Sequence, residues 1–137
     1  MPSRNHGRAQ TNLIGEFLQQ RQFSIYSELT LSIGGANYTP DVSVYLSEPA
    51  DFRHDELSRA EPPLVAVEIL SPSQSHQEIV EKAEFYLRNG VKSCWIVSPP
   101  LRTVTVLFAD AREEVFHRGT VTDPVVGLTA DLAKVFS

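Results

Sequence analysis

The chain has 137 residues, of which 42% are hydrophobic, and its formal net charge is −5. This length and composition predict one globular domain, residues 1–137, with a sizeable core. The negative charge argues against tight, nonspecific binding of nucleic acid through bulk electrostatics. It does not exclude a nuclease, because the carboxylates of a metal site contribute to the total.

The sequence contains no apolar run of the ~18 residues that a membrane-spanning helix needs. Its first ten residues lack the hydrophobic segment of a signal peptide. We therefore expect a cytoplasmic protein without a membrane partner. The one cysteine, Cys94, has no second cysteine with which to form an internal disulfide, and we expect it to pack as a small hydrophobic residue.

The first part of the chain predicts a helix, two antiparallel strands and a loop. Apolar residues recur at helical spacing from about Arg8 to Gln20. From Phe23 to Ile33 they alternate with polar residues, as in a half-buried strand, and after the glycine turn at 34–35 the run 38–46 returns as its partner. The charged, proline-rich stretch 47–63 predicts a surface loop, with or without a short helical turn.

The next part predicts a crossover between two parallel strands. An apolar strand contains Glu68, a helix runs from about Ser75 to Asn89 and ends at Gly90, and a further strand contains Trp95. Because a helix joins the strands of Glu68 and Trp95, we expect these strands to be parallel neighbours and the flanking hairpins to be antiparallel.

The last part predicts two more strands and a short helix. The strand-like runs are RTVTVLFA and EEVFHR, and a helix from about Thr129 to Phe136 closes the chain. Trp95 and Phe108 are expected in the core. The predicted fold class is therefore α/β, with a mixed β-sheet flanked by helices.

Glu68 interrupts the apolar run LVAVEIL. An ionised carboxylate in an apolar setting costs several kcal/mol unless a cation or hydrogen bonds compensate it. Three explanations are open: an edge strand whose polar face meets water, a local Arg or Lys partner, or a bound metal ion. The apolar run alone does not choose between them.

Asp41 stands at the start of the preceding predicted strand, and the connections allow its carboxylate to meet that of Glu68. Two carboxylates a few ångströms apart repel each other unless a cation lies between them. Hard oxygen ligands, with the Ile69 carbonyl as a further donor, favour Mg²⁺ (or Mn²⁺), which activates water and stabilises charge on a phosphoryl oxygen. An aspartate after proline is also common turn chemistry.

Three segments in this order carry a family resemblance: TPDVSVY, LVAVEILSPS and EKAEFYLRNGVKSCWIVSP. From about His6 to the C-terminus, the sequence resembles the PD-(D/E)XK nuclease superfamily, in its restriction-endonuclease branch of the Uma-two type, formerly a domain of unknown function. The resemblance implies a restriction-endonuclease-like fold with an αβββαβ-type core. It also implies a Mg²⁺-dependent endonuclease that hydrolyses DNA and leaves a 5′-phosphate, with Asp41 and Glu68 as the metal-binding carboxylates.

The superfamily's lysine normally stands two residues beyond the second acidic residue, where this chain has Leu70. In this branch a lysine on the following helix replaces it, and the matching residue is Lys82, which the resemblance makes the third catalytic candidate. Glu78, Lys82 and Tyr86 share one helix face. Lys82 either orients the attacking water and stabilises the pentavalent phosphate, or forms an ordinary surface salt bridge with Glu78.

Other polar residues give weaker signals. Glu28 matches a recurrent acidic position of the branch and either borders the site or is a plain exposed residue, and Glu78 stands where the branch usually has aspartate. The histidines show no metal-ligand spacing, so surface or packing roles are expected. They are His6, His54, His76 and His117. Serines near His76 lack the nucleophile elbow of a serine hydrolase.

The chain departs from the branch pattern in several places. Ser98 replaces the usual aspartate of WIVDP, and Cys94 replaces an aromatic residue. Relatives carry an additional N-terminal segment with an acidic hairpin, and its absence would open a sheet edge to dimerisation or reduce activity.

Two other functions are weighed against the DNA endonuclease. One is a catalytically inactive nuclease-fold module for DNA binding or assembly, and the other is a structural domain in which the carboxyl groups of Asp41 and Glu68 point apart. Cutting both strands of DNA needs two active sites, so the analogy with the fold predicts a homodimer.

Overall fold

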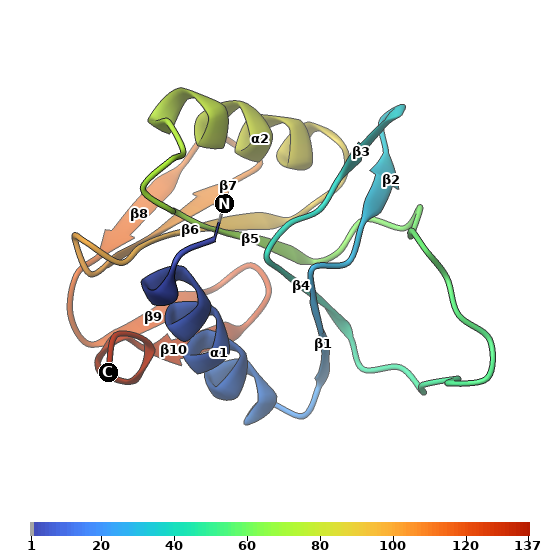
Figure 1. Cartoon of the computed structure of the whole chain (residues 1–137), viewed down its shortest axis with the longest axis horizontal. Helices are drawn as coiled ribbons and strands as arrows, with labels where there is room; N and C mark the ends of the chain where they lie inside the picture. Colours follow the sequence, from blue (N-terminus) through green and yellow to red (C-terminus); the bar gives the residue numbers. More distant parts are fainter. Residues whose placement is uncertain (1) are drawn as a thin grey trace.

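The computed structural model describes residues 2–137. A six-stranded mixed sheet with the strand order β1-β4-β5-β6-β7-β8 forms its centre, and two small two-stranded ribbons accompany it (Figure 1). The elements in chain order are α1 (Arg4–Leu18), β1 (Phe23–Ser27), β2 (Leu31–Ile33), β3 (Ala36–Tyr38), β4 (Val42–Leu46), β5 (Val65–Ile69), α2 (His76–Arg88), β6 (Ser93–Ser98), β7 (Thr103–Phe108), β8 (Glu113–Phe116), β9 (Thr120–Asp123), β10 (Leu128–Asp131) and α3 (Leu132–Val135).

The strands β5 and β6 are parallel, with Glu68 paired to Ile96, and all other neighbours in the sheet are antiparallel. This confirms the predicted crossover, because α2 connects the two parallel strands. The elements α1, β1, β4, β5, α2 and β6 give the predicted αβββαβ order, into which the β2–β3 ribbon is inserted. The mixed α/β architecture predicted from the sequence is confirmed.

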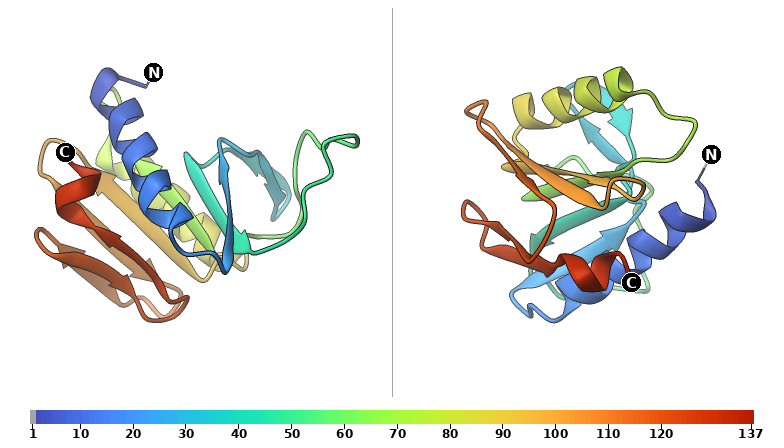
Figure 2. Two further views of the ribbon diagram at one scale, coloured as in Figure 1. Left: turned by 90° about the horizontal axis from the view of Figure 1, so that it is seen from below. Right: turned by 90° about the vertical axis from the view of Figure 1, so that its left-hand side faces the viewer.

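One face of the sheet is covered by α1, α3 and the β9–β10 ribbon, as the two views of Figure 2 show. Leu13 and Phe17 of α1 are fully buried there, and the Phe17 ring meets Trp95 edge to face at a centroid distance of 5.2 Å. Burial of such aromatic side chains supplies much of the hydrophobic free energy of a small core. Trp95 and Phe108 are buried as expected.

The other face is covered by α2, which packs through Ala83 and Tyr86 on Ala66 and Cys94. The Ser75 side chain caps the start of α2 by accepting a hydrogen bond from the Glu78 N–H, as predicted. Gly90, with φ of +102°, ends it, because this backbone conformation suits glycine. Cys94 is a free, buried cysteine, as expected.

The prediction of one strand from Phe23 to Ile33 is wrong. Glu28 has φ of +52°, a left-handed conformation that breaks the strand. The chain therefore leaves the sheet after β1, and β2 pairs with β3 instead. The predicted helix at 8–20 is present, but it begins earlier, at Arg4, with Ser3 as its N-cap.

The C-terminal prediction is also partly wrong. Residues 129–131 belong to β10 rather than to a helix, α3 covers only Leu132–Val135, and β9 was missed. Both strands have four residues, too few for a clear pattern, and long-range contacts hold them, including a 3.0 Å hydrogen bond from Trp95 Nε1 to Asp123 Oδ2.

The surface-loop prediction for residues 47–63 is confirmed, and the loop contains no helical turn. No helix among residues 2–137 has the length and apolar character needed to cross a membrane. The single-domain organisation stays a prediction.

Candidate active site

Asp41 forms hydrogen bonds to the main chain of β5 on both sides of Glu68. The Asp41 N–H donates to the Val67 carbonyl at 3.0 Å, and Asp41 Oδ2 accepts from the Ile69 N–H at 2.7 Å. Val67 and Ile69 are the two sequence neighbours of Glu68. The structure thus brings the two candidate carboxylates to the same end of β4 and β5.

Glu68 lies inside the sheet, between β4 and β6, and its side chain is only 3% exposed. The edge-strand explanation for this residue is therefore wrong. Its carboxylate faces α2, where Oε2 accepts a 2.8 Å hydrogen bond from the Tyr86 hydroxyl and Oε1 lies 3.7 Å from Lys82 Nζ.

Burial raises the pKa of Glu68 from its ordinary value to about 7. The negative charge of Asp41 raises this pKa further, whereas the Lys82 ammonium and the Tyr86 hydroxyl lower it. Burial thus disfavours the charged form of Glu68, and the nearby Lys82 ammonium offsets part of this penalty.

Lys82 pairs with Glu68 and not with Glu78. Its side chain is 31% exposed, so the ammonium lies where the buried carboxylate meets solvent. Glu78 is exposed on the first turn of α2, and no ion pair joins it to Lys82 in the described part of the chain. The described residues therefore do not contain the Glu78–Lys82 surface salt bridge that was one of the two roles considered for Lys82.

His6 is a site residue that the sequence reasoning missed. A surface or packing role was expected for His6. The residue is 4% exposed, and its Nε2 atom lies 3.2 Å from Asp41 Oδ2. His6 Nδ1 is buried without a hydrogen-bond partner within residues 2–137. Gln10, one helical turn later, donates from Nε2 to the Asp41 carbonyl at 3.0 Å. The i,i+4 spacing of these two polar residues on α1 was the available signal.

Glu28 touches the site through its main chain. Its N–H donates to the Asp41 carbonyl at 3.1 Å, while the residue itself is exposed. The left-handed conformation of Glu28 therefore positions the start of β4. Within the described residues, no hydrogen bond or ion pair joins the Glu28 side chain to Asp41 or Glu68.

The donor set suits a hard divalent cation. No group of three His, Cys, Asp or Glu side chains in the described chain is placed to hold a metal ion. Mg²⁺ needs only one or two protein carboxylates because it keeps several waters. Asp41 Oδ2 is engaged by Ile69 and His6, whereas its Oδ1 has no hydrogen-bond partner in residues 2–137. Two carboxylate donors without a thiolate fit magnesium or manganese better than zinc.

The fold is similar to that of a solved structure. The crystal structure of a putative nuclease belonging to DUF820 from Anabaena variabilis ATCC 29413, at 1.96 Å resolution, matches with a TM-score of 0.79 and 24% sequence identity. The match covers 99% of this chain and 82% of that chain. At this identity the likeness shows the fold alone, and it confirms the nuclease-type fold predicted from the sequence.

No curated protein matches the chain. The model of the Uma2 family, described as "Putative restriction endonuclease", matches residues 1–133. The chain therefore belongs to the Uma2 family and is a nuclease-like protein.

Proposed function

We propose that this protein is a Mg²⁺-dependent endonuclease that hydrolyses phosphodiester bonds of DNA. The main support for the proposal is the buried Glu68 carboxylate. It is paired with Lys82, and Asp41 is hydrogen-bonded to the main chain beside it. Membership of the Uma2 family supports a nuclease-like function.

In the proposed site, Asp41 and Glu68 hold the ion. The Ile69 N–H and His6 fix the Asp41 carboxylate, and the Tyr86 hydroxyl fixes that of Glu68. A bound divalent ion supplies a Lewis acid that lowers the pKa of water and stabilises charge on a phosphoryl oxygen. Fixed ligands of this kind reduce the reorganisation that the reaction needs.

Lys82 is proposed as the third catalytic residue. Its ammonium is partly exposed beside the buried carboxylate, where it can contact the phosphate and the attacking water. The proposed reaction is a hydrolysis in which water adds to phosphorus and the P–O3′ bond breaks. The products are a 5′-phosphate and a 3′-hydroxyl.

Plasmid nicking tests the proposal. With Mg²⁺ or Mn²⁺, wild-type protein is expected to convert supercoiled plasmid to the open circle, and Asp41→Asn and Glu68→Gln are each expected to abolish this. Glu81→Gln, at an exposed position of α2, is the matched control and keeps the activity. Circular dichroism shows whether each variant is folded. Equal residual cutting by wild type and both site variants would mean contamination, and the proposal fails.

A second candidate is a catalytically inactive nuclease-fold module that binds DNA or serves assembly. It is favoured by the lack of a three-residue metal-ligating group within residues 2–137. Such a module binds DNA and does not nick plasmid with either ion. Isothermal titration with Mn²⁺ separates the two candidates further, because only the enzyme needs a cation site that Glu68→Gln removes.

The proposed enzyme acts as a homodimer, because cutting both DNA strands needs two active sites. Light scattering during gel filtration measures the mass of the particle. A strictly monomeric protein that still makes double-strand breaks would contradict the proposed homodimer. A cytoplasmic location is part of the same proposal, and fractionation of cells tests it.

A further inference from the structure

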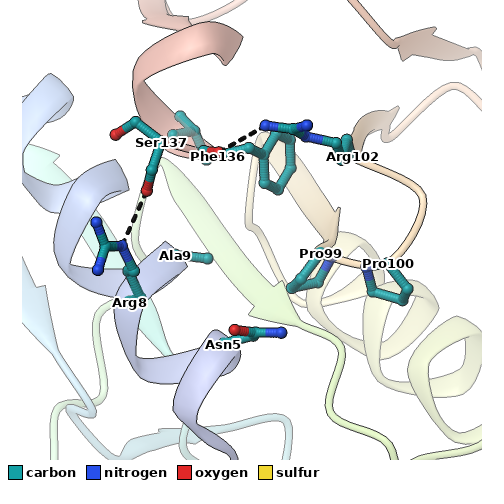
Figure 3. Close-up of a pocket in the computed structure, with 9 residues that line it drawn as sticks. Asn5, Arg8, Ala9, Pro99, Pro100, Arg102, Phe136 and Ser137 are labelled. Atoms are coloured by element: carbon teal, nitrogen blue, oxygen red, sulfur yellow. Dashed lines mark hydrogen bonds between the residues drawn. The ribbon is translucent and has the colours of Figure 1, made fainter.

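Two adjoining cavities lie beside the candidate site. The first, of about 250 Å³, is open to solvent and lies between α1, α3 and the turn before β7, and Figure 3 shows its lining residues. The second, of about 550 Å³, lies between the start of α1, the loop after β5 and the end of β6. The two share Asn5, Pro99 and Pro100 as walls, so together they form one furrow, lined on its polar side by Ser3, Asn5, Arg8, Ser71, Ser98 and Arg102.

The furrow lacks carboxylate side chains. Within residues 2–137, no Asp or Glu lines either cavity, although the chain has seventeen of them and a net charge of −5. The cavity beside the 47–63 loop is the opposite, because five acidic residues line it: Glu48, Asp51, Asp55, Glu56 and Glu61. A bound anion therefore meets no acidic side chain in the walls of the furrow within the described residues.

Arginines stand on opposite sides of the first cavity, as Figure 3 shows. Arg102 Nη2 donates to the Phe136 carbonyl at 2.8 Å, and Arg8 Nε donates to the Ser137 oxygen at 2.9 Å. Neither arginine pairs with an acidic side chain in the described residues. A guanidinium has five N–H donors, so each one keeps donors for a phosphate oxygen.

The helices α1 and α2 both begin at the second cavity, with Asn5 and His76 in its wall. Figures 1 and 2 agree that the two helices start on the same side of the molecule. The first N–H groups of a helix and its dipole favour an anion at this end.

Ser98 adds a polar group to the wall of the second cavity. It is 6% exposed, it lines the cavity, and its hydroxyl has no hydrogen-bond partner in the described chain. Strand alternation sets Ser98 on the same face of β6 as Cys94, which packs against α2, and that is the face on which His76 closes the cavity. A hydroxyl that opens onto the cavity and has no protein partner can donate to a bound oxygen atom.

We propose that this furrow binds the sugar-phosphate backbone of duplex DNA next to the Asp41–Glu68 site. The furrow adjoins the site at two points. Ser71 follows closely on Ile69, whose N–H holds Asp41, and Asn5 precedes His6, which contacts Asp41. The inference rests on the proposed function, which supplies DNA as the substrate.

Fluorescence anisotropy of a labelled DNA duplex in EDTA, measured over a series of NaCl concentrations, tests the proposal without hydrolysis. Loss of one phosphate contact in Arg102→Gln is expected to raise Kd about tenfold and to reduce the slope of log K against log salt by about 0.9. The matched control is Arg53→Gln, an exposed arginine in the 47–63 loop, which leaves both values unchanged.

A second variant keeps the test decisive if Arg102→Gln does not fold. Asn5→Asp keeps the shape of the side chain, and its new charge at a helix N-terminus favours the fold. It is expected to raise Kd because it places a carboxylate in the wall that both cavities share. Asn37→Asp, exposed on β3, adds the same charge elsewhere and is its control.

Unchanged Kd and salt slope in both Arg102→Gln and Asn5→Asp overturn the inference, and so does a wild-type protein that does not bind the duplex. If these variants bind as wild type and plasmid is nicked, the inference fails and the proposed enzyme stands. If the variants lose affinity as expected and wild type nicks no plasmid, the furrow is supported and the catalytic proposal fails.

Discussion

The Tyr86 hydroxyl donates a 2.8 Å hydrogen bond to Oε2 of Glu68 and so joins α2 to the middle of the sheet. Both residues are almost completely buried. The bond satisfies a carboxylate oxygen that has no access to water, and it fixes the direction in which the other oxygen points. The packing of α2 is therefore coupled to the geometry of the candidate site.

Tyr86→Phe removes this donor and leaves a buried carboxylate oxygen without a partner. We expect the free energy of unfolding, measured with urea at pH 8, to fall by about 1–3 kcal/mol. The fall in the free energy of unfolding is expected to be smaller at pH 5, because Glu68 is protonated there and has no negative charge for the Tyr86 hydroxyl to stabilise. Tyr38→Phe is the control, because the Tyr38 ring packs on Phe85 and Tyr86 while its hydroxyl has no partner in residues 2–137. Equal losses in the two variants would contradict the role of the bond.

Glu68 should make the metal-free protein less stable as the pH rises. Its pKa is about 7 in the folded protein and 4.5 in the reference state, so between these values the folded state binds more protons than the unfolded one. The free energy of unfolding therefore falls from about pH 4.5 to pH 7, by roughly 3 kcal/mol at 1.36 kcal/mol per pKa unit.

Glu68→Gln removes this dependence, and the difference between wild type and variant over the pH range isolates the Glu68 contribution from other groups. At pH 8, Mg²⁺ is expected to raise the melting temperature of wild type and not of Glu68→Gln, because only the folded wild type binds the ion. Parallel stability curves for the two proteins would show that Glu68 is not the titrating group.

Lys82→Met tests the role of the ammonium. The nicking rate at saturating Mg²⁺ is expected to fall about 100-fold or more, as on removal of other groups that stabilise transition-state charge. Mn²⁺ affinity should not fall, because the variant loses a positive charge that competes with the metal for Glu68. The free energy of unfolding at pH 8 is expected to fall as well, because the variant leaves the buried Glu68 carboxylate without its neighbouring cation. Lys92→Met, at an exposed position after α2, is the control, and wild-type cutting by Lys82→Met excludes Lys82 from the mechanism.

The β5–α2–β6 unit could be predicted because its signals are local. A continuous apolar run, the Ser75 cap and Gly90 define the elements, and the helical crossover defines the parallel pairing. The break at Glu28 could not be predicted in this way, because an alternating pattern does not reveal a left-handed residue. The β9–β10 ribbon depends on distant contacts, such as the one between Trp95 and Asp123, which no local pattern contains.

The candidate site was likewise only partly predictable from the sequence. Asp41 and Glu68 were candidates from their strand positions and from the family resemblance, and Lys82 from the resemblance. Tyr86 was assigned only to the helix face of Lys82. His6 was missed because its partner, Asp41, belongs to a different element and the two meet only in the folded chain. The furrow beside the site was not predicted for the same reason, since α1, the β6–β7 turn and α3 together line its first cavity.

His6 is expected to tune metal binding by positioning Asp41. Its Nε2 atom lies 3.2 Å from the Asp41 oxygen that also accepts the Ile69 N–H, so two donors hold one carboxylate oxygen and leave the other for a cation. In the proposed metal site, loss of the imidazole donor in His6→Leu is expected to weaken Mn²⁺ binding about 10- to 100-fold, as for other residues that orient metal ligands.

The matched variant is His6→Gln, because its amide N–H can occupy roughly the position of Nε2–H and donate to the same Asp41 oxygen. Isothermal titration should give a Mn²⁺ affinity for His6→Gln close to that of wild type, and melting curves without metal show whether either variant is simply less stable. Recovery with glutamine identifies the hydrogen bond as the cause, since leucine fills the buried space without donating. If leucine and glutamine weaken Mn²⁺ binding equally, His6 contributes through packing and does not position Asp41.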